Sequence, residues 1–155
     1  MKGDEHMCTA KEVSHYIVKY CAKKGTPISN LQLQKILYFA WRDYYQQTKS
    51  ALFQDEICAW QLGAVVPEVY YEYCPYGGLP IRTIYDDNQH SEIDKSIDID
   101  ILQHIVDKYR VLSARELVNM SHKKGDPWDL VYNDGEGHRK AIPFDLIKEH
   151  ADGVE

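Results

Sequence analysis

Histidine and cysteine are the side chains most suited to metal binding or nucleophilic catalysis, so their spacing is the first test for chemistry. The seven histidines are His6, His15, His90, His104, His122, His138 and His150. No two of them lie four residues apart on an expected helix, the spacing that lets one helix face hold a metal ion. The four cysteines are Cys8, Cys21, Cys58 and Cys74, and no two form the Cys-x-x-Cys unit of zinc knuckles and redox motifs. The sequence therefore predicts no metal site and no cofactor.

The strongest candidate for catalysis is His122, which lies close to Asp126 and Trp128 at the expected end of a helix. It could act as the general base of a small hydrolase. The alternative is a protonated histidine near the negative helix end, with Trp128 packed against the turn. We favour the second interpretation because the chain has no Gly-x-Ser-x-Gly elbow and no cysteine in an activating context. The sequence thus predicts no catalytic residue and no enzyme, with a hydrolase centred on His122 as the alternative.

Aromatic residues gather between Trp60 and Tyr76, in a chain with twelve tyrosines and three phenylalanines. On a helix that begins at Pro67, Tyr70 and Tyr73 share a face and Tyr71 points elsewhere. Tyrosine is enriched where binding energy concentrates, so this segment is the candidate contact surface for a protein partner. A tyrosine-rich core is the alternative, and nucleic-acid stacking is a third. The candidate partner-binding residues are Trp60, Val66, Tyr70, Tyr71, Tyr73 and Tyr76.

The composition is that of an ordinary globular domain, with 44% hydrophobic and 27% charged residues in 155. The net charge of −6 disfavours binding to nucleic-acid phosphates. The N-terminus runs into charge instead of an apolar signal segment, and the longest uncharged run is too short to span a bilayer. We therefore expect a cytoplasmic protein with reduced thiols, without contact to membrane or nucleic acid.

Three helix starts carry the same signature, a hydroxyl residue followed three positions later by Glu or Gln. The pairs are Thr9 with Glu12, Ser29 with Gln32, and Ser113 with Glu116. The helix expected over 30–47 is apolar on nearly all sides, which is typical of a central helix covered by its neighbours.

The remaining chain shows weaker patterns. Residues 57–62 are either a short buried strand or a helical turn ended by Gly63, and a helix is expected from Pro67 to about Cys74. A short strand is expected over 81–85, and the acidic stretch 86–100 is expected to be a solvated loop. Helices follow over 101–109, after Ser113 and near Phe144 to Lys148, whereas Gly135 to Gly137 is a turn. The fold class is mainly α, a single compact domain of about six helices around the central helix 30–47, with minor short β-strands.

Four blocks in order resemble the SocA-like antitoxin family, also called the Panacea domain. Residues 31–40 resemble its "LQKLLYYA" helix, and Phe53 with residues 57–60 resembles "LF…EAW". Residues 63–70 resemble "GPVVPEVY", followed by a "YG…PI" pattern at 76–81. Residues 121–128 resemble the late "TH…PW" signature. Ala64 stands where the family usually has proline, and Ser121 stands where it has threonine. The change at Ala64 affects the turn expected after Gly63 but not the resemblance to the family.

The resemblance implies a mainly helical domain over 9–150, between tails at 1–8 and 151–155. It implies an antitoxin without catalysis that neutralises a cognate protein toxin, encoded by a neighbouring gene, through direct contact. The alternative that it implies is a proteolytic adaptor that delivers the toxin to a host ATP-dependent protease. The family includes phage-associated proteins, and the acidic charge suits a basic toxin. The signature positions, which we expect to be structural, are Gln34, Lys35, Tyr38, Trp60, Gly63, Pro67, Tyr70, His122, Pro127 and Trp128.

Overall fold

The structure, a computed structural model, describes residues 7–82, 93 and 97–153. Its α-helices are α1 (Ala10–Lys23), α2 (Asn30–Thr48), α3 (Pro67–Tyr73), α4 (Ile99–Tyr109), α5 (Ala114–Ser121), α6 (Pro127–Tyr132) and α7 (Phe144–Gly153). Two strands, β1 (Cys58–Trp60) and β2 (Gly63–Val65), and two short 3₁₀ turns, η1 (Cys74–Tyr76) and η2 (Asn133–Gly135), complete the described part. The expected mainly α fold in a single domain is confirmed.

All three predicted capping boxes are present. Thr9, Ser29 and Ser113 each accept a hydrogen bond from the backbone three residues on, and the Glu or Gln there returns one. These reciprocal bonds satisfy backbone donors that the first helical turn leaves free. The starts of α1, α2 and α5 therefore follow directly from local sequence.

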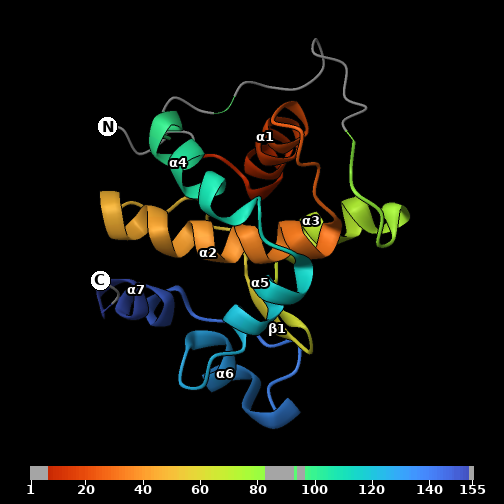
Figure 1. The fold of residues 1–155 in the computed structure, drawn as a ribbon. Coiled ribbons are helices and arrows are strands. Elements are labelled where there is room, and N and C mark those ends of the chain that lie inside the picture. Colours follow the sequence, from red (N-terminus) through yellow and green to blue (C-terminus); the bar gives the residue numbers. More distant parts are fainter. Residues whose placement is uncertain (1–6, 83–92, 94–96, 154–155) are drawn as a thin grey trace.

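Helix α2 is the centre of the molecule (Figure 1). It runs across the middle of the view, with α1 and α4 on one side and α7 and α5 on the other, and it contacts all four as well as β2 and α3. Its buried side includes polar residues, Gln34, Lys35 and Asp43, besides the expected apolar ones. A helix covered on several sides buries polar groups as well, and these require partners from the neighbouring elements.

The segment 57–66 forms an antiparallel hairpin in which Cys58 pairs with Val65 and Trp60 with Gly63. Of the two interpretations of residues 57–62, the strand is confirmed. The second strand, β2, was not predicted, since three buried residues show no alternation of polar and apolar side chains. On its other side, β1 pairs with the segment around Lys140, where Ala59 N donates a hydrogen bond to Lys140 O at 2.8 Å.

The structure also differs from the sequence-based expectation in three short segments. Ile81 and Arg82 are not in a strand, and the rest of the strand expected over 81–85 lies outside the described residues. Most of the acidic stretch 86–100 also lies outside them, but its end is helical, because Asp98 caps α4 and the helix begins at Ile99. Helix α6, absent from the prediction, has six residues, too few for a helical period to show in sequence.

Candidate partner-binding surface

An aromatic cluster joins β1 to α3. The ring centroids of Trp60 and Tyr70 lie 5.0 Å apart, and those of Tyr70 and Tyr71 lie 5.5 Å apart, both in edge-to-face geometry. Tyr71 also lies 6.2 Å from Trp60 and is 58% exposed. The hairpin and the start of α3 at Pro67 bring these rings together, since only six residues separate Trp60 from Pro67 along the chain. The cluster offers rigid aromatic area to the outside.

A pocket of about 410 Å³ opens beside this cluster. Its walls include Leu31, Trp60, Leu62, Val65, Tyr70 and His138. Leu62, at the tip of the hairpin, is 54% exposed, and Leu79 beyond η1 is 69% exposed. The pocket is large enough for a bulky side chain and is lined mainly by apolar groups with a few polar ones, as binding pockets are.

The other candidate residues of the segment lie differently. Val66 is fully buried and Tyr73 is 1% exposed, with the Tyr73 ring 6.4 Å from His15 on α1. Tyr76 is half-buried against Tyr73, at 6.1 Å between centroids. Val66 and Tyr73 therefore belong to the core beneath α3, and the surface considered below leaves them out.

Arg139 is a member of this surface that sequence reasoning did not identify. Its guanidinium lies over the Trp60 ring, 4.4 Å from the centroid, and its backbone N–H donates to Ala59 O at 2.6 Å. The run His138-Arg139-Lys140, all exposed, was the available signal in an acidic chain. Its pairing with Trp60 could not be predicted, because 78 residues lie between the two in the sequence and only the fold brings them together.

The signature residues of α2 hold the hairpin in place. Gln34 Oε1 accepts a hydrogen bond from Val66 N at 2.9 Å, and Lys35 Nζ donates to Ala64 O at 2.8 Å. Tyr38 OH accepts one from Trp128 N at 3.1 Å, which connects α2 to α6. These bonds satisfy backbone groups at the end of the hairpin and the start of α6, where regular pairing stops.

Lys35 is fully buried, and burial lowers its pKa from 10.5 to about 7. A Cβ atom at Gly63 would come within 2.7 Å of both Lys35 Cε and Ser121 Oγ. Gly63 also has φ of +116°, which other residues rarely adopt. Glycine at this position therefore lets α2, α5 and the hairpin approach one another.

His122 caps the end of α5, and its ring stacks on Trp128. Burial lowers its pKa, the neighbouring Lys35 lowers it further, and a hydrogen bond to the Leu62 backbone acts in the opposite direction. The expectation of a packed histidine beside Trp128 is confirmed. The lowered pKa disfavours the protonated form that was expected for it, because desolvation opposes the charge. His122 is not among the residues that line the pocket.

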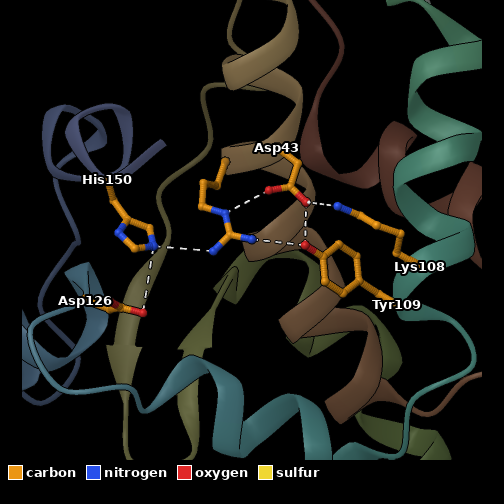
Figure 2. Close-up of polar contacts among 6 residues, drawn as sticks. Asp43, Lys108, Tyr109, Asp126 and His150 are labelled. Atoms are coloured by element: carbon orange, nitrogen blue, oxygen red, sulfur yellow. Dashed lines mark hydrogen bonds and ion pairs between the residues drawn. The ribbon is translucent and has the colours of Figure 1, made fainter. Parts of the chain in front are cut away.

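A buried polar network, which the sequence analysis did not foresee, ties α2 to α4 (Figure 2). Asp43 is 3% exposed and accepts hydrogen bonds from Arg42 Nε at 2.8 Å and from the Tyr109 hydroxyl. Lys108 Nζ lies 3.2 Å from the same carboxylate, and Arg42 Nη2 donates to Tyr109 OH at 3.1 Å. Three donors around one carboxylate compensate for its loss of water.

The network continues to α7 through His150 (Figure 2). Arg42 Nη1 lies 3.4 Å from His150 Nε2, and this nitrogen is 3.8 Å from Asp126 Oδ2. Burial lowers the pKa of His150. A neutral imidazole can accept a hydrogen bond from Arg42 at Nε2, whereas a protonated one would place a second cation beside the guanidinium. The arrangement joins α2 to α4 and α7.

Metal and thiol chemistry have little support in this part of the chain. Within residues 7–82, 93 and 97–153, no group of three His, Cys, Asp or Glu side chains could hold a metal ion. Burial raises the pKa of Cys21 to about 12, which removes thiolate character, and the pKa of Cys58 is raised for the same reason. Among the described residues, no helix has both the length and the apolar character needed to cross a bilayer.

Comparisons with known proteins agree with the sequence resemblance. Residues 33–129 match the family model described as antitoxin SocA-like, Panacea domain. The chain is also similar to the protein named Antitoxin SocA from Caulobacter vibrioides (strain NA1000 / CB15N), with 32% identity over 138 residues. That alignment covers 84% of this chain and 73% of the relative. No solved structure matches. The matched range holds the α2 contacts, the hairpin, α3 and the stacked pair His122 and Trp128, whereas Arg139 lies beyond it.

Proposed function

Because the chain belongs to the SocA-like Panacea-domain antitoxin family, we propose that it neutralises a cognate protein toxin by binding it directly. The toxin is the product of a neighbouring gene, and the chain contributes contact surface with no catalysis of its own. The residues proposed for the contact are Trp60, Leu62, Tyr70 and Tyr71, with Tyr76 at the margin.

The observation that carries this proposal is the exposed aromatic cluster beside the pocket of about 410 Å³. The exposed Tyr71 packs edge-on against Tyr70 and tilted against Trp60. It loses little side-chain entropy when a partner covers it, because these neighbours already restrict it. Exposed Leu62 extends the same surface with apolar area. Contact energy in protein interfaces concentrates at such aromatic anchors.

The primary experiment is a growth assay. The neighbouring open reading frame is expressed with and without this protein, and the two products are then co-purified through a tag on the antitoxin. Rescue of growth together with a stable complex supports masking by direct binding. Rescue with disappearance of the toxin, reversed in cells that lack the ATP-dependent protease, would replace masking by the adaptor mechanism. A neighbour that is harmless in both strains would contradict the proposed partner.

The surface is tested by matched substitutions. Leu62→Ala and Tyr71→Ala should weaken co-purification and rescue while the melting temperature stays close to that of the wild type. Leu130→Ala is the control, because Leu130 is 56% exposed, as Leu62 is at 54%, but does not line the pocket. Tyr73→Ala should instead lower stability by about 3–5 kcal/mol, as removal of a buried aromatic ring does. If Leu62→Ala and Tyr71→Ala bind the toxin as tightly as the Leu130 control, the contact lies elsewhere.

A further inference from the structure

We propose that the pocket receives one large apolar side chain of the toxin, and that a carboxylate beside that side chain binds Arg139. This inference rests on the proposed function and specifies its partner: an acidic-apolar segment, although the net charge of −6 would favour a basic toxin overall. The juxtaposition of the Trp60 ring, the apolar pocket and the Arg139 guanidinium is its basis.

A cation lies beside the pocket. The exposed Arg139 lies over the ring of Trp60, a residue of the pocket wall, and no carboxylate lines the pocket. Among the described residues, neither Arg139 nor Lys140 forms an ion pair. Arg139 also affects the pKa of Tyr70. Burial raises this pKa, Cys74 and Tyr71 raise it further, and the positive charge of Arg139 lowers it. The site thus presents a cation that is not neutralised by the described part of the chain.

The guanidinium is held in a geometry that suits a carboxylate. The guanidinium carbon lies over the face of Trp60, 4.4 Å from the ring centroid. A guanidinium that stacks on an aromatic face keeps the N–H donors at its edge available. These donors can form two parallel hydrogen bonds to one carboxylate. A lysine at this position would offer a point charge without the planar fork.

The backbone beneath Arg139 is also fixed. Arg139 has φ of +73°, a conformation that costs energy for a side chain larger than glycine. The hydrogen bond from Arg139 N to Ala59 O at 2.6 Å, together with that from Lys140 N to Gly137 O at 2.9 Å, keeps the chain there. A fixed backbone reduces the entropy lost when a partner binds the side chain.

The alternative mode, addition of a partner strand to the hairpin, is blocked. β1 is paired on one side with β2 and on the other with the chain near Lys140. On the side of β2, Lys35 Nζ donates a hydrogen bond to Ala64 O, and Gln34 Oε1 accepts one from Val66 N. These backbone groups are therefore not available to a partner strand. Recognition therefore depends on inserted side chains rather than on backbone pairing.

The experiment selects ligands from a displayed library of random linear peptides on the immobilised full chain. The expected result is enrichment of peptides that carry Phe, Tyr, Trp or Leu next to Asp or Glu. Arg139→Glu should lower the affinity of these peptides by about ten- to hundredfold, the effect of losing a charge-assisted hydrogen-bonded pair. Lys140→Glu is the matched control, since it changes the net charge by the same amount one residue away and should have a much smaller effect. Circular dichroism of both variants checks that the fold is retained.

Three results would overturn the inference. They are no enrichment, enrichment without acidic residues, and equal effects of Arg139→Glu and Lys140→Glu. The proposed function is tested separately by toxin rescue. If Leu62→Ala abolishes rescue but Arg139→Glu leaves it intact, the aromatic surface remains the toxin contact and only the carboxylate partner fails. If Arg139→Glu abolishes rescue and the library gives acidic-apolar peptides, both stand.

Discussion

The imidazole of His122 lies flat against the indole of Trp128, with ring centroids 4.0 Å apart and planes 6° from parallel. Trp128 in turn donates from Nε1 to Trp60 O at 2.7 Å, so the pair fastens the end of α5 to the hairpin that carries the aromatic surface. A residue that resembled a catalytic base in the sequence thus lies behind the candidate surface, as part of its support.

Stability should depend on the His122 ring and not on its proton chemistry. His122→Ala should lower the free energy of unfolding by about 1–2 kcal/mol, through loss of stacking and buried area. His122→Phe keeps a flat ring against Trp128 and should retain both stability and toxin neutralisation. Denaturant unfolding and the growth assay measure the two. If a His122→Phe protein of full stability lost neutralisation, this result would support the alternative of a hydrolase centred on His122.

The buried Lys35 amine should make stability rise with pH above neutrality. Its folded-state pKa of about 7 lies below the unfolded value of 10.5, so between these values the unfolded chain binds more protons. The free energy of unfolding should therefore increase as pH rises through this range, by at most about 1.4 kcal/mol per pH unit. Lys35→Met removes the titrating group, so its unfolding free energy should have a flatter pH profile. Parallel profiles for the two proteins, measured by urea titration, would refute this assignment.

Acid should destabilise the protein through His150 as well as His122. Their pKa values are lowered by burial from 6.5, so on acidification the unfolded chain takes up protons first and stability is lost as pH falls through the folded-state pKa. His150 faces Asp126 and Asp43, which favour its protonation, and Arg42 and Lys123, which oppose it. His150→Gln should flatten the acid side of the melting-temperature profile while Arg42 keeps an acceptor. An unchanged profile would show that His150 protonates equally well in both states.

The carboxylate of Asp43 should contribute more to the free energy of unfolding than the Tyr109 hydroxyl or the Lys108 amine that contacts it. Asp43→Ala leaves the Arg42 charge and the Tyr109 hydroxyl without their acceptor and should cost about 3–5 kcal/mol. Tyr109→Phe keeps the stack on Phe39, at 5.2 Å between centroids, and should cost about 1 kcal/mol for the lost hydrogen bond. The exposed Lys108→Ala should change stability by less than about 1 kcal/mol. Thermal unfolding of the three variants checks this order, and an equal loss for Asp43→Ala and Lys108→Ala would contradict it.

Much of the helical frame could be read from sequence because its signals are local. A capping box such as Ser29 with Gln32 closes within one helical turn, and the apolar character of α2 depends only on its own residues. The ordered family blocks likewise lie along the chain and predicted the family that the comparisons confirm. Strand β2 and helix α6 escaped prediction because elements of three and six residues are too short to show a period.

The surface itself depended on tertiary structure. Sequence placed Val66, Tyr71 and Tyr73 in one aromatic segment, but only packing against α1 and α2 determined that Tyr71 faces outward while the other two are core. Arg139 reaches Trp60, and His150 reaches Arg42, across long stretches of chain that carry no pattern linking them. The sequence by itself determined the local elements and the family, since hydrogen bonds within a turn and ordered motifs specify those. Which groups meet was decided by the fold, because burial and charge pairing depend on distances between elements that contact one another only after packing.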